Sequence, residues 1–369
     1  MTLTFGYRDP SFVRQLSERL RELAPKDEII KICHVCGTHE WVITHFGLRA
    51  LLPPTVEVIA GPGCPVCIVP SSEIDEAIKI SLEGVGILTF GDVVRVPGSE
   101  LSLLDAKARG AEVRVVYSLS DAIKIAKKDP DKQFVFLAVG FETTAPSTAV
   151  EILGKPPKNF SFLISHRLIP PAMKLLAETK DLMLNGFIAP GHVSTVIGLK
   201  PYQIFPEQYG IPTVIAGFEP TDILIAIFMI LRQLSEGESR LENEYTRAVR
   251  YEGNIKAQNV MRKVFNIENG KWRGLGVIPS SKFSLKGEYE NFDAHIKYGM
   301  KIEEGADLRP GCKCNLVIVG RIKPIECPLF MKSCTPQNPM GACMVSIEGT
   351  CRIWAEAGIN ISRQTTENR

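Results

Sequence analysis

Short apolar runs that alternate with amphipathic segments constrain the fold of this chain more than any other feature. Eight such runs, rich in Val, Ile and Phe, occur between residues 28 and 216. Buried strands separated by helices are typical of parallel sheets that are covered on both faces. The predicted strands are Glu28–Val35, Val56–Ala60, Val85–Phe90, Val113–Tyr117, Phe134–Val139, Phe160–Ile164, Phe187–Ala189 and Thr213–Ala216.

Two of these strands end alike, in Val58-Ile59-Ala60-Gly61 and Val214-Ile215-Ala216-Gly217, which hints at two related α/β units. We therefore expect an α/β fold with two parallel-sheet domains, residues 1–140 and 141–270, followed by a loop-rich domain over residues 271–369. The segment Thr221–Leu234 is apolar almost all round, so we expect a helix buried between domains.

Composition argues against several classes of partner. The 369-residue chain has a formal net charge of +2 with both signs interspersed, so neither nucleic acid nor a membrane is expected as its main partner. Its longest apolar run, Ile223–Leu231, is far shorter than the roughly 20 residues of a membrane helix. The N-terminal segment lacks the pattern of an export signal, so we expect a cytoplasmic protein with reduced thiols.

The carboxyl ends of the predicted strands form the expected binding site, because ligands in open α/β sheets bind there. The residues at these ends are Cys36, the Cys64/Cys67 turn, Gly91-Asp92, Gly140–Pro146, Ser165–Arg167 and Pro190–His192. None of these turns carries a Gly-x-Gly-x-x-Gly or Walker-type loop, which argues against a nucleotide-binding fold. One cleft lined by these residues is the prediction.

The ten cysteines fall into two groups, one at positions 33, 36, 64 and 67 and one between 312 and 351. Near the C-terminus, Cys327, Cys334, Cys343 and Cys351 are separated by 7, 9 and 8 positions in an irregular segment rich in Pro and Gly. This spacing allows four thiolates to surround one iron–sulfur cluster. An all-cysteine zinc site usually has two close pairs, which this spacing lacks, and unligated thiols are the third alternative.

The N-terminal cysteines form two Cys-x-x-Cys units, for which a zinc ribbon is the structural alternative. Cys64 and Cys67 lie in a turn that leads toward a helix N-terminus, which lowers a thiol pKa and favours a redox pair. Cys36 is followed by Gly37, which allows close approach of a ligand, and by His39. A thiolate beside an imidazole is a plausible site for a soft metal ion.

Other polar side chains near the predicted cleft have structural alternatives. His39 could hydrogen-bond to the backbone at its own helix start, and His166 and His192 are more simply interpreted as structural histidines. Glu142 follows a buried strand, where it is either a hydrogen-bonded buried acid or a catalytic carboxylate.

Five motifs occur in order along the chain. They are Cys36-Gly37-Thr38-His39, Gly61-Pro62-Gly63-Cys64-Pro65-Val66-Cys67, Gly140-Phe141-Glu142-Thr143-Thr144-Ala145-Pro146, Pro190-Gly191-His192-Val193-Ser194 and Cys343-Met344-Val345-Ser346-Ile347-Glu348-Gly349-Thr350-Cys351. Together they resemble the HypD family of maturation proteins for [NiFe]-hydrogenases. The resemblance spans nearly the whole chain and is far more specific than any one Cys-x-x-Cys.

The resemblance implies a scaffold rather than a conventional turnover enzyme. With the small partner HypC, such a protein holds the iron on which the Fe(CN)2CO group is assembled, and cyanide arrives from the partner HypE. By motif, Cys36 would ligate the iron beside His39, Cys64 and Cys67 would be the redox pair, and Cys327, Cys334, Cys343 and Cys351 would hold a [4Fe-4S] cluster. On this interpretation the Cys64/Cys67 pair connects the cluster with Cys36, so these thiols must meet at one cleft.

Two departures leave alternatives open. Cys33 lies outside the family signature, so a Cys33/Cys36 disulfide could compete with iron binding. Cys312 and Cys314 precede a strand-like Leu316–Val319 and could form a second thiol pair. The rival function is a thiol-disulfide oxidoreductase of the ferredoxin:thioredoxin reductase type, and a purely structural zinc protein is the third.

Overall fold

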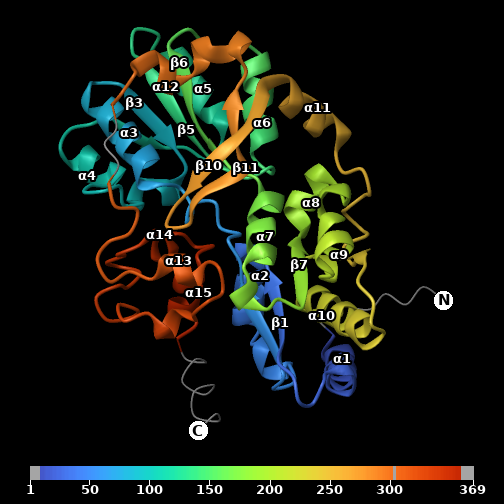
Figure 1. Ribbon diagram of the computed structural model, residues 1–369. Helices are drawn as coiled ribbons and strands as arrows, with labels where there is room; N and C mark the ends of the chain where they lie inside the picture. Colours follow the sequence, from blue (N-terminus) through green and yellow to red (C-terminus); the bar gives the residue numbers. More distant parts are fainter. Residues whose placement is uncertain (1–8, 302–304, 359–369) are drawn as a thin grey trace.

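The structure is a computed structural model that describes residues 9–301 and 305–358. Two parallel β-sheets with helices packed on them are followed by a C-terminal segment of short helices and loops, drawn in orange and red in Figure 1. All eight predicted strands are present, as β1 to β8. The expected α/β class, with two parallel sheets and a loop-rich cysteine-containing end, is therefore confirmed.

The first sheet has five strands in the order β2-β1-β7-β8-β9. The strands are β1 (Ile30–His34), β2 (Val56–Ala60), β7 (Gly186–Pro190), β8 (Thr213–Ala216) and β9 (Leu241–Asn243). One apolar layer is built from this sheet with α1 (Pro10–Leu23), α2 (Gly37–His45) and α10 (Pro220–Ser235). A second layer contains α7 (Ile169–Glu178), α8 (Gly191–Ile197), α9 (Ile204–Tyr209) and the C-terminal cysteines.

The second sheet has four strands in the order β4-β3-β5-β6. They are β3 (Gly86–Thr89), β4 (Val113–Val115), β5 (Phe134–Gly140) and β6 (Phe160–His166). Side chains of β5 alternate between two apolar layers, as a strand buried on both faces requires. The helices of these layers are α3 (Ser71–Leu82), α4 (Leu103–Ala108), α5 (Leu119–Lys128), α6 (Ala145–Leu153) and α11 (Ile255–Val264).

The chain crosses between the two sheets more than once, so residue 140 does not separate them. The strands β1 and β2 pair in one sheet with β7 and β8, which lie beyond residue 140. Likewise β5 and β6 pair across that position, from Phe134↔Phe160 to Gly140↔His166. The segment after β2, which carries Cys64 and Cys67, is the first crossing, so it lies between the sheets and not within either of them.

Residues after the second unit form an antiparallel hairpin that the sequence did not predict. Its strands are β10 (Phe265–Trp272) and β11 (Gly276–Leu285). β11 contacts β6 and α7, β10 contacts α11, and α12 (Ala294–Tyr298) also packs on β6. These residues therefore pack on the second sheet, although they were expected to belong largely to the third domain. The cysteine-rich segment that follows contains α13 (Cys314–Val317), α14 (Ala342–Val345) and α15 (Thr350–Glu356). Short 3₁₀ turns lie at η1 (Leu48–Leu51), η2 (Gly91–Arg95), η3 (Lys180–Leu182), η4 (Lys200–Tyr202), η5 (Gly287–Phe292) and η6 (Pro324–Glu326).

Two local predictions were wrong. The segment Leu316–Val319, predicted to be strand-like, spans the end of the short helix α13 and the turn that follows it. An apolar run this short satisfies either periodicity. The apolar helix α10 does not lie between domains. It packs on the first sheet and is covered by α1, which explains its burial on both sides. In the described part of the chain, no helix has the length and apolarity that crossing a bilayer requires.

Candidate functional site

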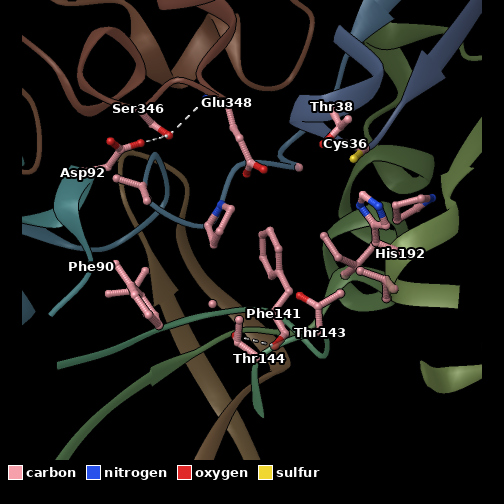
Figure 2. A pocket seen from close by; sticks show the side chains of 18 of the residues that line it. Cys36, Thr38, Phe90, Asp92, Phe141, Thr143, Thr144, His192, Ser346 and Glu348 are labelled. Carbon is pink, nitrogen blue, oxygen red and sulfur yellow. Dashed lines mark hydrogen bonds between the residues drawn. The ribbon is translucent and has the colours of Figure 1, made fainter. Parts of the chain in front are cut away.

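A cavity of about 620 Å³ lies where the carboxyl ends of the two sheets face each other. Cys36 and His192 follow β1 and β7 of the first sheet, whereas Asp92 and Phe141 follow β3 and β5 of the second. Figure 2 shows Cys36 and His192 on one side of this cavity and Asp92 on the other, with Glu348 of the C-terminal segment above. A cleft at the strand ends is therefore present as predicted, but Cys64, Cys67 and Ser165–Arg167 are not among its lining residues.

Cys36 is held at the junction between β1 and α2, where it is the residue before the first helical turn. Burial raises the pKa of its thiol to about 11, while the backbone N–H groups of His39 and Thr38 oppose this rise. Gly63 packs directly on this junction, since a Cβ atom there would lie 2.3 Å from Cys36 N. Gly37 is needed for a similar reason, because a Cβ atom there would lie 2.5 Å from the Glu348 carbonyl oxygen.

Cys64 and Cys67 form a disulfide in the turn that crosses between the sheets. Together with Cys36 they line a second, much smaller cavity of about 10 Å³, which also includes Glu348 and Thr350. This space is roughly that needed by one water molecule. The three thiol positions therefore lie on the same side of the fold, as the sequence interpretation requires. Cys33, by contrast, is a free buried thiol, as is Cys36, so no disulfide joins them.

His39 faces away from the cavity. Its ring is fully buried, and its Nε2 lies 3.0 Å from Gly217 O and 3.3 Å from Ala216 O. Burial lowers the pKa of His39 to about 3, so the ring is neutral. The imidazole therefore fixes the turn after β8, and His192 supplies the imidazole that lines the cavity.

Phe218 connects the two histidines and was not predicted as a site residue. Its ring stacks on His39 at a centroid distance of 5.0 Å and on His192 at 3.7 Å. Phe218 follows β8 in a Gly-Phe-Glu sequence, just as Phe141 follows β5. This repeated sequence is the signal from which Phe218 could have been found.

Glu142 and His166 are buried behind the cavity wall. The carboxylate of Glu142 accepts hydrogen bonds from Ile169 N at 3.1 and 3.3 Å, and burial raises the pKa of Glu142 to about 8. Its neighbours Phe141 and Thr143 line the cavity instead. His166 Nε2 lies 2.9 Å from Thr148 Oγ1, consistent with a structural histidine.

Most C-terminal cysteines converge into one group, which we call the C-terminal cysteine group. It consists of Cys312, Cys314, Cys334, Cys343 and Cys351. The sulfur atoms of Cys312 and Cys314 are 3.2 Å apart, and a Cβ atom on Gly341 would lie within 2.8 Å of both. The expected second thiol pair therefore lies inside the group.

Cys343 is central to this group. Hydrogen bonds from the Cys314 and Cys351 thiols lower the pKa of Cys343, and Cys351 N also donates to its sulfur at 3.2 Å. Cys327 is buried in the loop that leads to Cys334, and its side chain makes no hydrogen bond within the described residues. The disulfide lies beside the group, since Cys67 Sγ is 4.0 Å from the carbonyl of Ala342.

As the side chains stand, no set of three or more His, Cys, Asp or Glu residues in the ranges 9–301 and 305–358 is arranged to hold a metal ion. Within the C-terminal cysteine group, the sulfur atoms of Cys312 and Cys314 are in contact, and Cys343 is hydrogen-bonded to the thiols of Cys314 and Cys351. The donor set nevertheless fits an iron–sulfur cluster in kind, because its members are buried thiols.

Glu40 ties the cysteine-rich segment to the helix that starts after Cys36. Its buried carboxylate accepts hydrogen bonds from His34 Nε2, Thr44 Oγ1, the Arg49 guanidinium and Trp354 Nε1, the last at 2.7 Å. Burial opposes its ionisation, but Arg49 and His34 hold the pKa of Glu40 well below its usual range. Because Trp354 lies on α15 beside Cys351, this one carboxylate joins α2 to α15.

The fold and site define a thiol-based α/β protein. Its two parallel sheets enclose a cavity with one cysteine, and a disulfide and a group of buried thiols lie beside that cavity. Comparison with known proteins identifies the family. The HypD family model, described as "Hydrogenase formation hypA family", matches residues 11–358. The chain belongs to the HypD family, whose members named below are hydrogenase maturation factors.

Similar proteins cover almost the whole chain. A Methanocaldococcus jannaschii protein named for hydrogenase expression and formation is 47% identical over 350 residues, covering 94% of this chain and 97% of that protein. The hydrogenase maturation factor HypD of Azotobacter vinelandii is 43% identical over 365 residues, covering 95% of this chain and 96% of that protein. The HypD protein of Escherichia coli is 43% identical over 358 residues, with coverage of 94% and 96%. A role in hydrogenase maturation follows from this membership.

Proposed function

We propose that this protein holds iron at Cys36, together with HypC, while the Fe(CN)2CO group of a [NiFe]-hydrogenase is assembled with cyanide from HypE. The observation that carries the proposal is the position of Cys36. Of the described residues that line the cavity between the sheets, Cys36 is the one cysteine, and the Cys64–Cys67 disulfide lies next to it. The expected cytoplasmic location belongs to the same proposal, since free thiols persist in reducing compartments.

The environment of Cys36 suits a thiol that ionises only when it binds a metal. Burial keeps the free thiol protonated, because its pKa is raised to about 11. Metal binding requires the thiolate and releases the proton, and the N–H groups of Thr38 and His39 then stabilise the negative sulfur. A thiolate is a soft ligand that favours iron in a low oxidation state. His192 is neutral because burial lowers its pKa, so its ring can accept a hydrogen bond inside the cavity.

The disulfide supplies the redox chemistry of the proposal. Reduction breaks the bond between Cys64 and Cys67 and takes up two electrons and two protons to give two thiols. We propose that a [4Fe-4S] cluster is held within residues 312–351, with Cys327, Cys334, Cys343 and Cys351 as the ligands that the sequence spacing favours. When bound, such a cluster supplies electrons one at a time. Cys67 Sγ lies close to the chain at Ala342, beside Cys343. This short distance supports electron transfer between the proposed cluster and the Cys64–Cys67 disulfide.

Infrared spectroscopy of the anaerobically purified complex with HypC tests the proposal. We expect cyanide and carbonyl stretching bands in the wild type and their loss in Cys36→Ala. The matched control is Cys33→Ala, which removes another buried thiol that does not line the cavity and should keep the bands.

Other outcomes separate the rival functions. Absence of the bands in the wild type, with turnover of protein disulfides, would favour a thiol-disulfide oxidoreductase. Zinc without iron in metal analysis of the purified protein would indicate a structural zinc protein.

A further inference from the structure

Arg273 is a buried cation that does not line the cavity and is not one of the proposed metal ligands. It lies between β10 and β11 and is 2% exposed. Its three guanidinium nitrogens donate to three carbonyl oxygens, with Nε 2.5 Å from Val69 O, Nη1 2.8 Å from Asp307 O and Nη2 2.8 Å from Pro97 O. Within the described residues these acceptors are all main-chain oxygens, so no carboxylate neutralises the charge by direct hydrogen bonding. A buried charge of this kind is costly unless an anion lies nearby.

Two of the three acceptors, Val69 and Asp307, belong to segments that are next to cysteines in the sequence. Val69 follows Cys67 by two positions, and the backbone N–H of Arg273 also donates to Ile68 O at 2.9 Å. Asp307 precedes Cys312 by five positions. Arg273 therefore joins the chain just after the disulfide to the chain just before the C-terminal cysteine group.

Cys312 and Cys314 lie within electrostatic range of Arg273. Burial lowers the pKa of Arg273, and the groups that oppose this are Asp307, Cys314, Asp75 and Cys312, in that order. The two carboxylates are already engaged by other donors: Asp307 accepts from Ser71 and Gly274, and Asp75 accepts from Ser99. Negative charge that develops on the sulfur atoms of Cys312 and Cys314 would therefore be stabilised by the guanidinium.

We propose that Arg273 is a positioning residue that holds the segment after Cys67 against the C-terminal cysteine group and supplies the buried positive charge that stabilises reduced, anionic sulfur there. The inference rests on the proposed function, because it assumes a cluster held within residues 312–351, with Cys334, Cys343 and Cys351 of the group among its ligands. One-electron reduction makes such a centre more negative by one charge, and a nearby fixed cation favours that state. Removal of the cation should lower the equilibrium constant for reduction about tenfold. This corresponds to a shift of the midpoint potential of about 59 mV for one electron.

The test is a redox titration of the anaerobically purified protein with dithionite as reductant, followed by electron paramagnetic resonance. Arg273→Met, which removes the charge at similar length, should shift the midpoint potential to more negative values. Arg273→Lys keeps the charge and should stay close to the wild type. The matched control is Arg167→Met, which removes another fully buried arginine, one paired with Glu73, and should leave the potential unchanged.

A variant with the opposite expected sign keeps the inference testable if Arg273→Met does not fold. Asp307→Asn removes the carboxylate that interacts most strongly with the charge of Arg273. This change should shift the midpoint potential to less negative values. Unchanged potentials in Arg273→Met or Asp307→Asn, with a normal cluster signal, overturn the inference alone. A wild-type protein without any cluster signal overturns the proposed cluster, and the inference with it.

Discussion

The glycine that supports Cys36 offers the sharpest structural test. In Gly63→Ala the new methyl carbon would lie 2.3 Å from Cys36 N, 2.4 Å from Cys36 Cα and 2.5 Å from Val35 C. Ordinary Cβ contacts begin near 3.4 Å, and these atoms are main-chain, so no side-chain rotation relieves the overlap. The turn must move away from the Cys36 junction by about 1 Å, which also stretches the 3.3 Å hydrogen bond from Gly37 N to Gly63 O.

Overpacking of this kind costs about 1–3 kcal/mol, and the weakened hydrogen bond adds up to about 1 kcal/mol. We therefore expect Gly63→Ala to lower the free energy of unfolding by about 2–4 kcal/mol, measured by urea denaturation. Because the displacement separates Cys36 from the disulfide turn, the infrared bands of the complex with HypC should also decrease relative to the amount of folded protein.

Gly91→Ala is the matched control, since Gly91 lines the same cavity. A Cβ atom there would meet only Val115 Cγ1, at 3.6 Å, which is an ordinary contact. Its free energy of unfolding should be unchanged or slightly increased, by up to about 1 kcal/mol, because alanine restricts the unfolded chain. Equal stability and equal band intensity in the two variants would refute the argument that Gly63 positions Cys36.

Three further predictions concern buried groups. The folded-state pKa of Glu142 is raised to about 8, so the stability of the wild type should fall as pH rises from about 4.5 to 8. Glu142→Gln should lack this loss and exceed the wild type by roughly 1–3 kcal/mol at pH 8 in urea denaturation. Trp354→Phe removes the hydrogen bond to the ionised Glu40 and should lower the free energy of unfolding by about 1.5–3 kcal/mol. Cys343→Ala should abolish the visible absorption of an iron–sulfur cluster, because Cys343 is central to the C-terminal cysteine group.

Matched variants separate these effects from general damage. Glu83→Gln alters an exposed carboxylate and should keep the wild-type pH dependence of stability. A gain in stability at pH 8 equal to that of Glu142→Gln would contradict the raised pKa of Glu142 as the cause. Trp41→Phe changes a tryptophan that is 43% exposed and should alter stability by less than about 0.5 kcal/mol. Cys33→Ala should retain the cluster absorption, and its loss there as well would show that the thiols are not acting as specific ligands.

Local sequence patterns predicted the parts of the fold that depend on local periodicity. Eight of the nine strands of the two parallel sheets were recognisable, because buried parallel strands are continuous apolar runs between helices. The strand β9, which has three residues of intermediate burial, was not predicted. The hairpin of β10 and β11 was missed, because exposed and buried residues are mixed along its strands and form no continuous apolar run. The helix α13 was mistaken for a strand, because four apolar residues do not distinguish the two periods.

Strand ends also predicted much of the site. Cys36, Asp92, Phe141 and His192 line one cavity because the carboxyl ends of parallel strands gather at one edge. The same reasoning could not tell in which direction a side chain points at a strand end. It therefore included Glu142, which faces away behind the cavity wall.

The sequence by itself determined the chemistry of this protein: its family, its thiols and the strand ends that carry them. These are local properties, since a motif or an apolar run is complete within a few residues. Only the tertiary structure decided which of these groups meet. Several contacts join residues that are far apart in the chain. They are the pairing of β1 with β7, the stacking of Phe218 between His39 and His192, and the hydrogen bonds of Glu40 and Arg273. Such contacts are set by how the two sheets and the C-terminal segment pack together, and no short stretch of sequence contains that information.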